Sequence, residues 1–167
     1  MKKSFLFTIL AWALAGCAER QTDSAPAVLT DRIRFAEAVF PSGGKLLVGS
    51  FGSSELDPLN TEGKGYVLEF TDTVSRVLIP ADGNLSAPKG MLVKDSCLLI
   101  ADVGKLAVYD LRDTAAAPQI VRFPDGELYV NDMALHGNTL YVTVTNTGSI
   151  YSLDVTRPYA IDTASLK

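Results

Sequence analysis

The chain is poor in the residues from which disulfide scaffolds, zinc sites and nucleophile motifs are built. Its 167 residues contain two cysteines and one histidine, so neither a disulfide framework nor a Cys/His zinc cluster can form. There is no glycine-rich phosphate loop, and the segment 49–52 lacks the Gly-x-Ser-x-Gly spacing of a nucleophile elbow. These absences exclude small disulfide-rich proteins, zinc fingers, P-loop enzymes and hydrolases that use such an elbow.

Basic patches and helical periodicity are missing as well. The formal net charge is −4, and no basic patch interrupts the sequence, which argues against nucleic acid as a partner. No stretch has a convincing apolar spacing for an amphipathic helix. The acidic segment 57–62 has the charge of a calcium loop, but its alternating positions fall on Leu59 and Thr61, so an EF-hand loop is excluded.

The first residues have the organisation of an export signal. Lys2 and Lys3 form a positively charged start, and residues 5–15 are uncharged and mostly apolar. This run is shorter than the roughly 20 apolar residues of a transmembrane helix, so we interpret residues 1–16 as a signal peptide. The sequence Leu-Ala-Gly-Cys at 14–17 resembles the lipobox of bacterial lipoproteins, which implies cleavage before Cys17 and lipidation of its thiol. An ordinary secretory signal with an unrelated cysteine is the alternative.

A lipid anchor at Cys17 implies a protein of the bacterial cell envelope, facing the periplasm or the outer surface, with the membrane as a partner. Residues 17–27 are small and polar and are expected to form a flexible tether to a folded part that spans 28–167. Loss of Lys2 and Lys3 with the signal makes the mature chain more negative than −4. Cys97 then has no intrachain partner and is expected to be a buried small hydrophobe.

The folded part is predicted to be all-β. Short apolar runs of strand length alternate with turns rich in Gly, Pro, Asn and Asp. Clear examples of such runs are 45–50, 97–102 and 139–143, and two further strands are expected at 75–79 and 119–123.

These strands recur in a repeat of about 40 residues. Between the second and third units, 87–92 aligns with 129–134 and 98–100 with 140–142, both at a spacing of 42 residues, and 104–110 aligns with 148–154 at a spacing of 44. Between the first and second units, 46–48 aligns with 98–100 at a spacing of 52. The longer first spacing is explained by a polar loop at 52–63.

Four strands in about 40 residues are typical of a β-propeller blade. We therefore expect blades near 34–80, 86–124 and 129–167, the last one incomplete; a β-sandwich with coincidental spacing is the alternative. Propellers typically have 4–8 blades, so the three units form an incomplete ring. A fragment of a longer protein is favoured over a natural half-ring that pairs with another, and the open blade edges are expected to favour self-association.

The opening of the first unit carries a family resemblance. Phe-Ala-Glu-Ala-Val-Phe at 35–40, followed by Gly-Gly-Lys-Leu-Leu-Val at 43–48, resembles the start of the senescence marker protein/gluconolactonase family, and Asn-Asp-Met at 131–133 resembles its third inner strand. The resemblance implies a six-bladed propeller in which Glu37 binds a divalent metal and Asn131 faces the substrate. The family usually has Pro and an aromatic soon after this Glu, where the chain has Ala-Val-Phe at 38–40, one residue tighter, and an Arg often stands where the chain has Tyr129. The other metal ligands of the family would lie beyond Lys167.

Glu37, Lys89 and Asn131 occupy one equivalent position of the repeat, which places them at the same mouth of a propeller channel. A carboxylate and an amide oxygen suit calcium, magnesium or manganese, and zinc less well. Such a metal would polarise a lactone carbonyl and acidify a water molecule. The alternative is that Glu37 and Lys89 are solvated rim charges that partly neutralise each other.

Two functions remain open at this point. One is a metal-dependent hydrolase of lactones or related esters, active once the ring is complete and inactive in this chain alone. The other is a non-catalytic propeller scaffold that binds a small-molecule ligand or a protein at the cell envelope. The fold does not decide between them. Inner strands that begin with Asn-Gly and then Asp-Gly after Lys167 would favour the enzyme.

Overall fold

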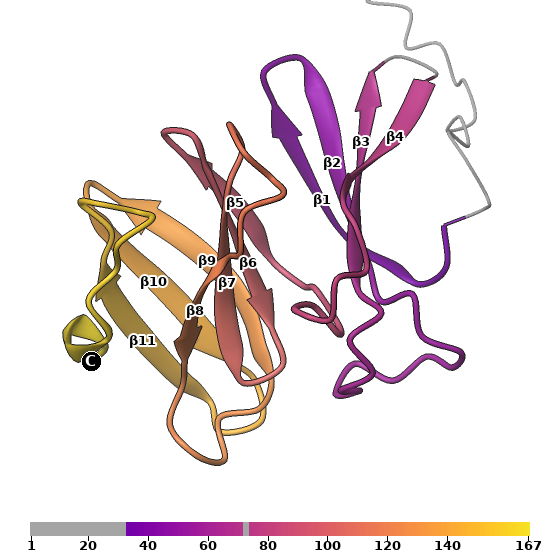
Figure 1. Ribbon diagram of the computed structural model, residues 1–167. Coiled ribbons are helices and arrows are strands. Elements are labelled where there is room, and N and C mark those ends of the chain that lie inside the picture. The colour runs from indigo at the N-terminus through magenta and orange to yellow at the C-terminus, as the bar shows by residue number, and fades with distance from the viewer. Residues whose placement is uncertain (1–32, 72–73) are drawn as a thin grey trace, which may run out of the picture.

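The computed structural model describes residues 33–71 and 74–167 as three antiparallel sheets that stand side by side (Figure 1). The predicted signal peptide, the tether and Cys17 lie outside these residues. Within the described part, no helix is long and apolar enough to cross a membrane. The all-β prediction is confirmed, since the described helical structure amounts to one short 3-10 turn, η1 (Thr163–Ser165).

The first sheet contains four strands in sequence order: β1 (Ala36–Ser42), β2 (Lys45–Ser50), β3 (Tyr66–Thr71) and β4 (Val74–Ile79). Between β1 and β2 the chain reverses at Gly43 and Gly44, whose φ angles of 55° and 78° are readily adopted only by glycine. Two such residues in succession make the tight hairpin turn that matches the twist of the strands. The loop between β2 and β3 covers 51–65 and accounts for the longer first repeat.

The second sheet has the same order, with β5 (Met91–Lys94), β6 (Cys97–Asp102), β7 (Lys105–Asp110) and β8 (Gln119–Arg122). The third has three strands, β9 (Val130–His136), β10 (Thr139–Val144) and β11 (Ser149–Asp154). The strands expected at 45–50 and 97–102 have the predicted bounds. The strand β5 begins at Met91, two residues after Lys89.

The second sheet is covered on both faces, and this sandwiching forms the core. One face packs on the first sheet, with Met91, Leu98, Ile100, Ala107 and Tyr109 against Leu47, Val67 and Ile79. The other face packs on the third sheet, with Leu99, Ala101, Leu106 and Val108 against Leu140, Val142 and Leu153. Side chains alternate between the two faces along each strand, so continuous apolar runs such as 97–102 belong to strands that are buried on both sides.

The segment after β11 packs against the end of the third unit, which was expected to be an incomplete blade. Ile161 is 4 % exposed, and its backbone exchanges two hydrogen bonds with the side chain of Gln119, at 2.8 and 3.0 Å. The amide and carbonyl of Lys167 likewise pair with those of Ser152 on β11, at 3.1 and 2.9 Å. The outer edge of the third sheet is therefore partly covered by the chain itself.

Candidate functional site at the inner strands

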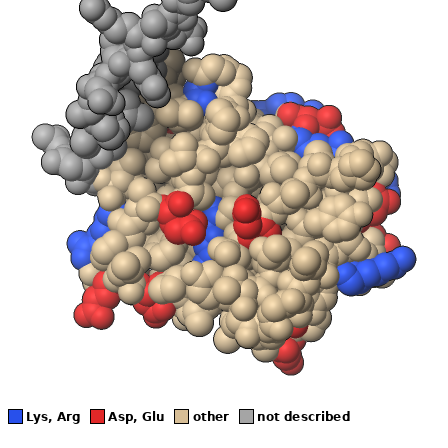
Figure 2. All heavy atoms as spheres, turned by 180° about the vertical axis from the view of Figure 1, so that it is seen from behind, with Lys and Arg blue, Asp and Glu red and all other residues tan. Residues whose placement is uncertain are grey.

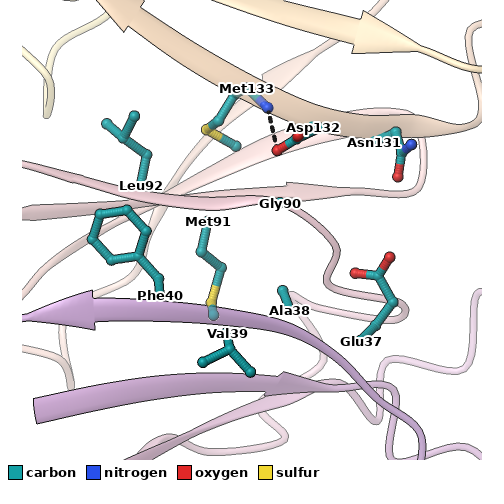
Figure 3. A pocket seen from close by; sticks show the side chains of 10 residues that line it. All are labelled: Glu37, Ala38, Val39, Phe40, Gly90, Met91, Leu92, Asn131, Asp132 and Met133. Atoms are coloured by element: carbon teal, nitrogen blue, oxygen red, sulfur yellow. Dashed lines mark hydrogen bonds between the residues drawn. The ribbon is translucent and has the colours of Figure 1, made fainter. Parts of the chain in front are cut away.

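The first strands of the three sheets, β1, β5 and β9, are neighbours, and their adjacent residues line an open hollow of about 500 Å³. Figure 3 shows its lining, which is Glu37, Ala38, Val39, Phe40, Gly90, Met91, Leu92, Asn131, Asp132 and Met133. The polar side chains gather at one end, where the strands begin, and the apolar ones at the other. Two of the three positions predicted for the channel mouth, Glu37 and Asn131, thus share this pocket.

A β-bulge places Glu37 at the pocket. The pairing of β1 with β2 shifts between Ala36 and Ala38, so Glu37 is the extra residue that has no partner on β2. A bulge bends its strand and re-aims the side chain of the extra residue. In Figure 3 the carboxylate of Glu37 points across the pocket toward the side chain of Asn131.

The same irregularity recurs in the other two sheets. In the third sheet the register shifts between Val142 and Val144, so Thr143 faces both Asn131 and Asp132. In the second sheet Ala101 accepts a hydrogen bond from the Lys89 amide and donates one to Gly90, at 2.8 and 2.9 Å. The repeat position shared by Glu37, Lys89 and Asn131 is therefore irregular in each unit: Glu37 and Asn131 lie at register shifts, and Lys89 and Gly90 both pair with Ala101 just before β5.

Lys89 is fully buried and is not among the residues that line the pocket. Its Nζ donates a hydrogen bond to the carbonyl of Ala87 at 3.0 Å, and it lies 4.9 Å from the ring centre of Tyr129 and 5.9 Å from that of Phe51. Burial lowers the pKa of the ammonium, while Asp102 and Glu37 oppose the shift. The alternative of a solvated rim charge is wrong for Lys89, which instead joins all three sheets through cation–π contacts.

Asp132 is a pocket residue that the sequence reasoning did not assign. Its Oδ1 accepts a hydrogen bond from the amide of Met133 at 2.8 Å, and Figure 3 shows the side chain beside Gly90. The pKa of Glu37 is raised by loss of hydration in the pocket, a shift that Lys89 opposes and Asp132 reinforces. The carboxylates of Glu37 and Asp132 thus line the same pocket and influence each other electrostatically. The sequence shows Asn131 and Asp132 side by side, but the repeat position of Glu37 and Lys89 aligns with Asn131 alone. The alignment therefore gives no reason to select Asp132.

Charge is sparse on much of the face seen in Figure 2, where two acidic groups flank a small basic one near its middle. The oxygens of Glu37, Asn131 and Asp132 are of the type that hard divalent cations prefer. Among residues 33–71 and 74–167, no three His, Cys, Asp or Glu side chains are grouped so that they could hold a metal ion. The donor set is thus suitable in kind but supplies only part of the 6–8 oxygens that calcium takes.

Comparison with known proteins supports the fold. No protein-family model matches the chain, and no curated protein matches it. A chain in the crystal structure of a nidogen/laminin complex is similar over 81 % of this chain and 49 % of its own length, with 18 % identity and a TM-score of 0.62. The computationally designed proteins Ika4 and Ika8 are more distantly similar, with 15 % and 13 % identity and TM-scores of 0.48 and 0.44; the matches cover 72 % and 73 % of this chain and 66 % and 46 % of theirs. The chain thus spans about half the length of the nidogen/laminin chain it matches, and its three sheets have a propeller-like all-β architecture.

Proposed function

We propose that this chain is part of a six-bladed, gluconolactonase-like propeller that hydrolyses lactones or related esters with the help of a divalent metal. The observation that carries the proposal is the convergence of Glu37 and Asn131 on one pocket, each presented by a bulge at the start of an inner strand. The resemblance of the segments around these two residues to the gluconolactonase family supplies the reaction class.

In this proposal each side chain of the pocket has a separate task. Glu37 binds the metal through its carboxylate, and Asn131 orients the substrate or serves as a second ligand. Lys89 favours the ionised form of Glu37 electrostatically, because its buried positive charge opposes the effects of desolvation and of Asp132. The bound metal would polarise the carbonyl of the ester. The apolar end of the pocket, with Phe40 and Met133, accommodates the carbon skeleton.

The first prediction concerns the metal site. Titrating Mn²⁺ into the protein should broaden NMR signals of Asn131 and Gly90 selectively, and Glu37→Gln should abolish this broadening because it removes the charged ligand. Since the pKa of Glu37 is raised above its ordinary value of 4.5, the broadening should disappear as the pH falls, and the loss should begin above pH 4.5. Paramagnetic broadening is chosen because it detects weak binding by an incomplete ligand set.

Glu55→Gln is the matched control, because Glu55 is exposed in the loop 51–65, away from the pocket lining, and it should leave the Mn²⁺ effect unchanged. Equal broadening in wild type and Glu37→Gln would refute the assignment of Glu37. Acid release from γ- and δ-lactones, followed with a pH indicator, then tests the reaction itself in protein whose ring is complete. If the protein bound metal but released acid from no lactone, the assignment of the metal site would stand and the proposed hydrolase activity would be refuted.

A non-catalytic scaffold is the second candidate, and the composition of the pocket favours it. Six of the ten lining residues are apolar, including two methionines, which adapt readily to different ligands. A ligand could therefore bind at this end of the inner strands without being transformed. The absence of any Mn²⁺ effect at Asn131 would favour this function over the hydrolase.

The cell-envelope location is a proposal that rests on the sequence Leu-Ala-Gly-Cys at 14–17. In a bacterial host fed a labelled fatty acid, the wild-type chain should incorporate label, whereas Cys17→Ser should incorporate none because the acylated thiol is missing. The variant should also accumulate as an unprocessed or soluble form. Cys97→Ser serves as the control and should remain labelled. Label retained in Cys17→Ser would show that Cys17 is not the lipidated residue.

A further inference from the structure

The outward face of the third sheet is open, although it is built like an interface between sheets. Tyr141 and Ile150 point away from the second sheet and are 43 % and 69 % exposed. Their repeat counterparts in the second sheet, Leu99 and Leu106, are fully buried. The same comparison pairs Thr143 and Ser152 with the buried Ala101 and Val108. These four positions are core contacts in the second sheet and are exposed or partly exposed on the third.

The first sheet has a complementary face that is open only in part, since Val48 and Phe70 on that side are 7 % and 8 % exposed. Val39 and Val77 lie on its side away from the second sheet and are 63 % and 56 % exposed. The repeat counterpart of Val39 is Met91, which is 7 % exposed because the first sheet packs over it. The two ends of the three-sheet array thus carry the two halves of the contact that already occurs twice within it.

We infer that two copies of this chain pair head to tail, with the outward face of β9–β11 of one copy packed on the exposed part of the outward face of β1–β4, around Val39 and Val77, of the other. A two-fold axis makes both contacts identical, so the pairing closes on itself and leaves no open end. The propeller-like chain of the nidogen/laminin complex is about twice as long as the part that this chain matches.

The pairing uses the faces of the sheets and not their strand edges. Lys167 already satisfies the backbone of Ser152 on the outer strand β11, which reduces the tendency of that edge to recruit another strand. Burial of Tyr141, Ile150, Val39 and Val77 would supply an apolar interface that resembles the existing ones. The inference does not depend on the hydrolase proposal, since it concerns the end faces and not the pocket.

Size-exclusion chromatography with light scattering on the whole chain tests the inference, with the mass of two chains as the expected result. Ile150→Asp should weaken the pairing by about tenfold or more, because it would bury a charge in the contact. Leu56→Asp is the matched control, since Leu56 is 68 % exposed but lies in the loop between β2 and β3, and it should leave the two-chain species intact.

Val77→Asp tests whether the pairing is head to tail. It should weaken the pairing as much as Ile150→Asp does, and mixing the two variants should restore part of the two-chain species, because one intact contact remains between them. A monomeric or heterogeneous wild-type chain would overturn the inference. Unchanged pairing in Val77→Asp would also overturn it, because that result would mean that the third sheets contact each other.

Discussion

Replacing Asp102 with alanine is expected to lower the free energy of unfolding by about 3–5 kcal/mol. The carboxylate is fully buried at the end of β6. It accepts hydrogen bonds from the amides of Ser86 and Ala87 at 2.9 and 2.7 Å, and it lies 3.2 Å from the Nζ of Lys105. Alanine would leave two buried amides without their acceptor and Lys105 without its partner, and each unsatisfied buried group costs stability.

Urea unfolding followed by circular dichroism measures this loss. Asp113→Ala is the control, because Asp113 is exposed and its carboxylate accepts one long hydrogen bond of 3.3 Å from Ala115; its effect should be within about 0.5 kcal/mol, as is usual for surface substitutions. If the two variants unfold at the same urea concentration, Asp102 does not fix the chain that precedes β5.

Gly90→Ala is expected to destabilise the protein by up to about 3 kcal/mol, because an added methyl group has no space between the second and third sheets. A Cβ at this position would lie 2.8 Å from the carbonyl oxygen of Asn131, and also 2.8 Å from the Cα and Oδ1 of Asp132. The Gly90 amide donates to the same Asn131 carbonyl at 2.7 Å. Separating these strands would also move Asn131 relative to Glu37, so the Mn²⁺ broadening at the pocket should weaken.

Gly49→Ala is the matched control for this substitution. Gly49 lies in β2 and, like Gly90, has no positive φ, but a Cβ there would make contacts no closer than 3.6 Å, to Met91 and Pro88. Alanine fits this space and removes backbone entropy from the unfolded chain, so the variant should be unchanged or stabilised by about 0.5–1 kcal/mol. Thermal unfolding of both variants decides the matter, and equal melting temperatures would show that the two sheets can separate at Gly90 without cost.

The strands and their repeat could be predicted because each depends on short segments. Apolar runs between turn residues define β2 and β6 with the observed bounds, and the constant spacing between units relates Glu37, Lys89 and Asn131 before any contact is known. A bulge adds one residue at one position of a strand. When it occurs at the same position in each unit, the spacing between units stays constant and the repeat can still be recognised.

The burial of Lys89 could not be predicted, because the groups that surround it come from different parts of the chain. Phe51 follows β2 and Tyr129 precedes β9, so nothing near Lys89 in the sequence indicates an aromatic environment. The packing of the segment after β11 could not be predicted for the same reason, because its partner is distant in the sequence. Its composition is that of a loop, but Gln119, 42 residues earlier, satisfies the backbone of Ile161 and holds the segment in place.

The recurrent irregularity of the inner strands is formed by backbone hydrogen bonds, so its shape does not depend on which side chain stands at that position. Backbone pairing creates this irregularity in each unit, and it does so around a carboxylate, an ammonium and an amide at Glu37, Lys89 and Asn131 alike. A substitution at one of these positions can therefore alter the chemistry at that end of the inner strands while the hydrogen bonds that shape the strand stay in place. At Glu37 and Asn131, which line the open pocket, mutation can thus explore new ligands at little risk to folding, whereas Lys89 is fully buried against two aromatic rings and lacks this freedom.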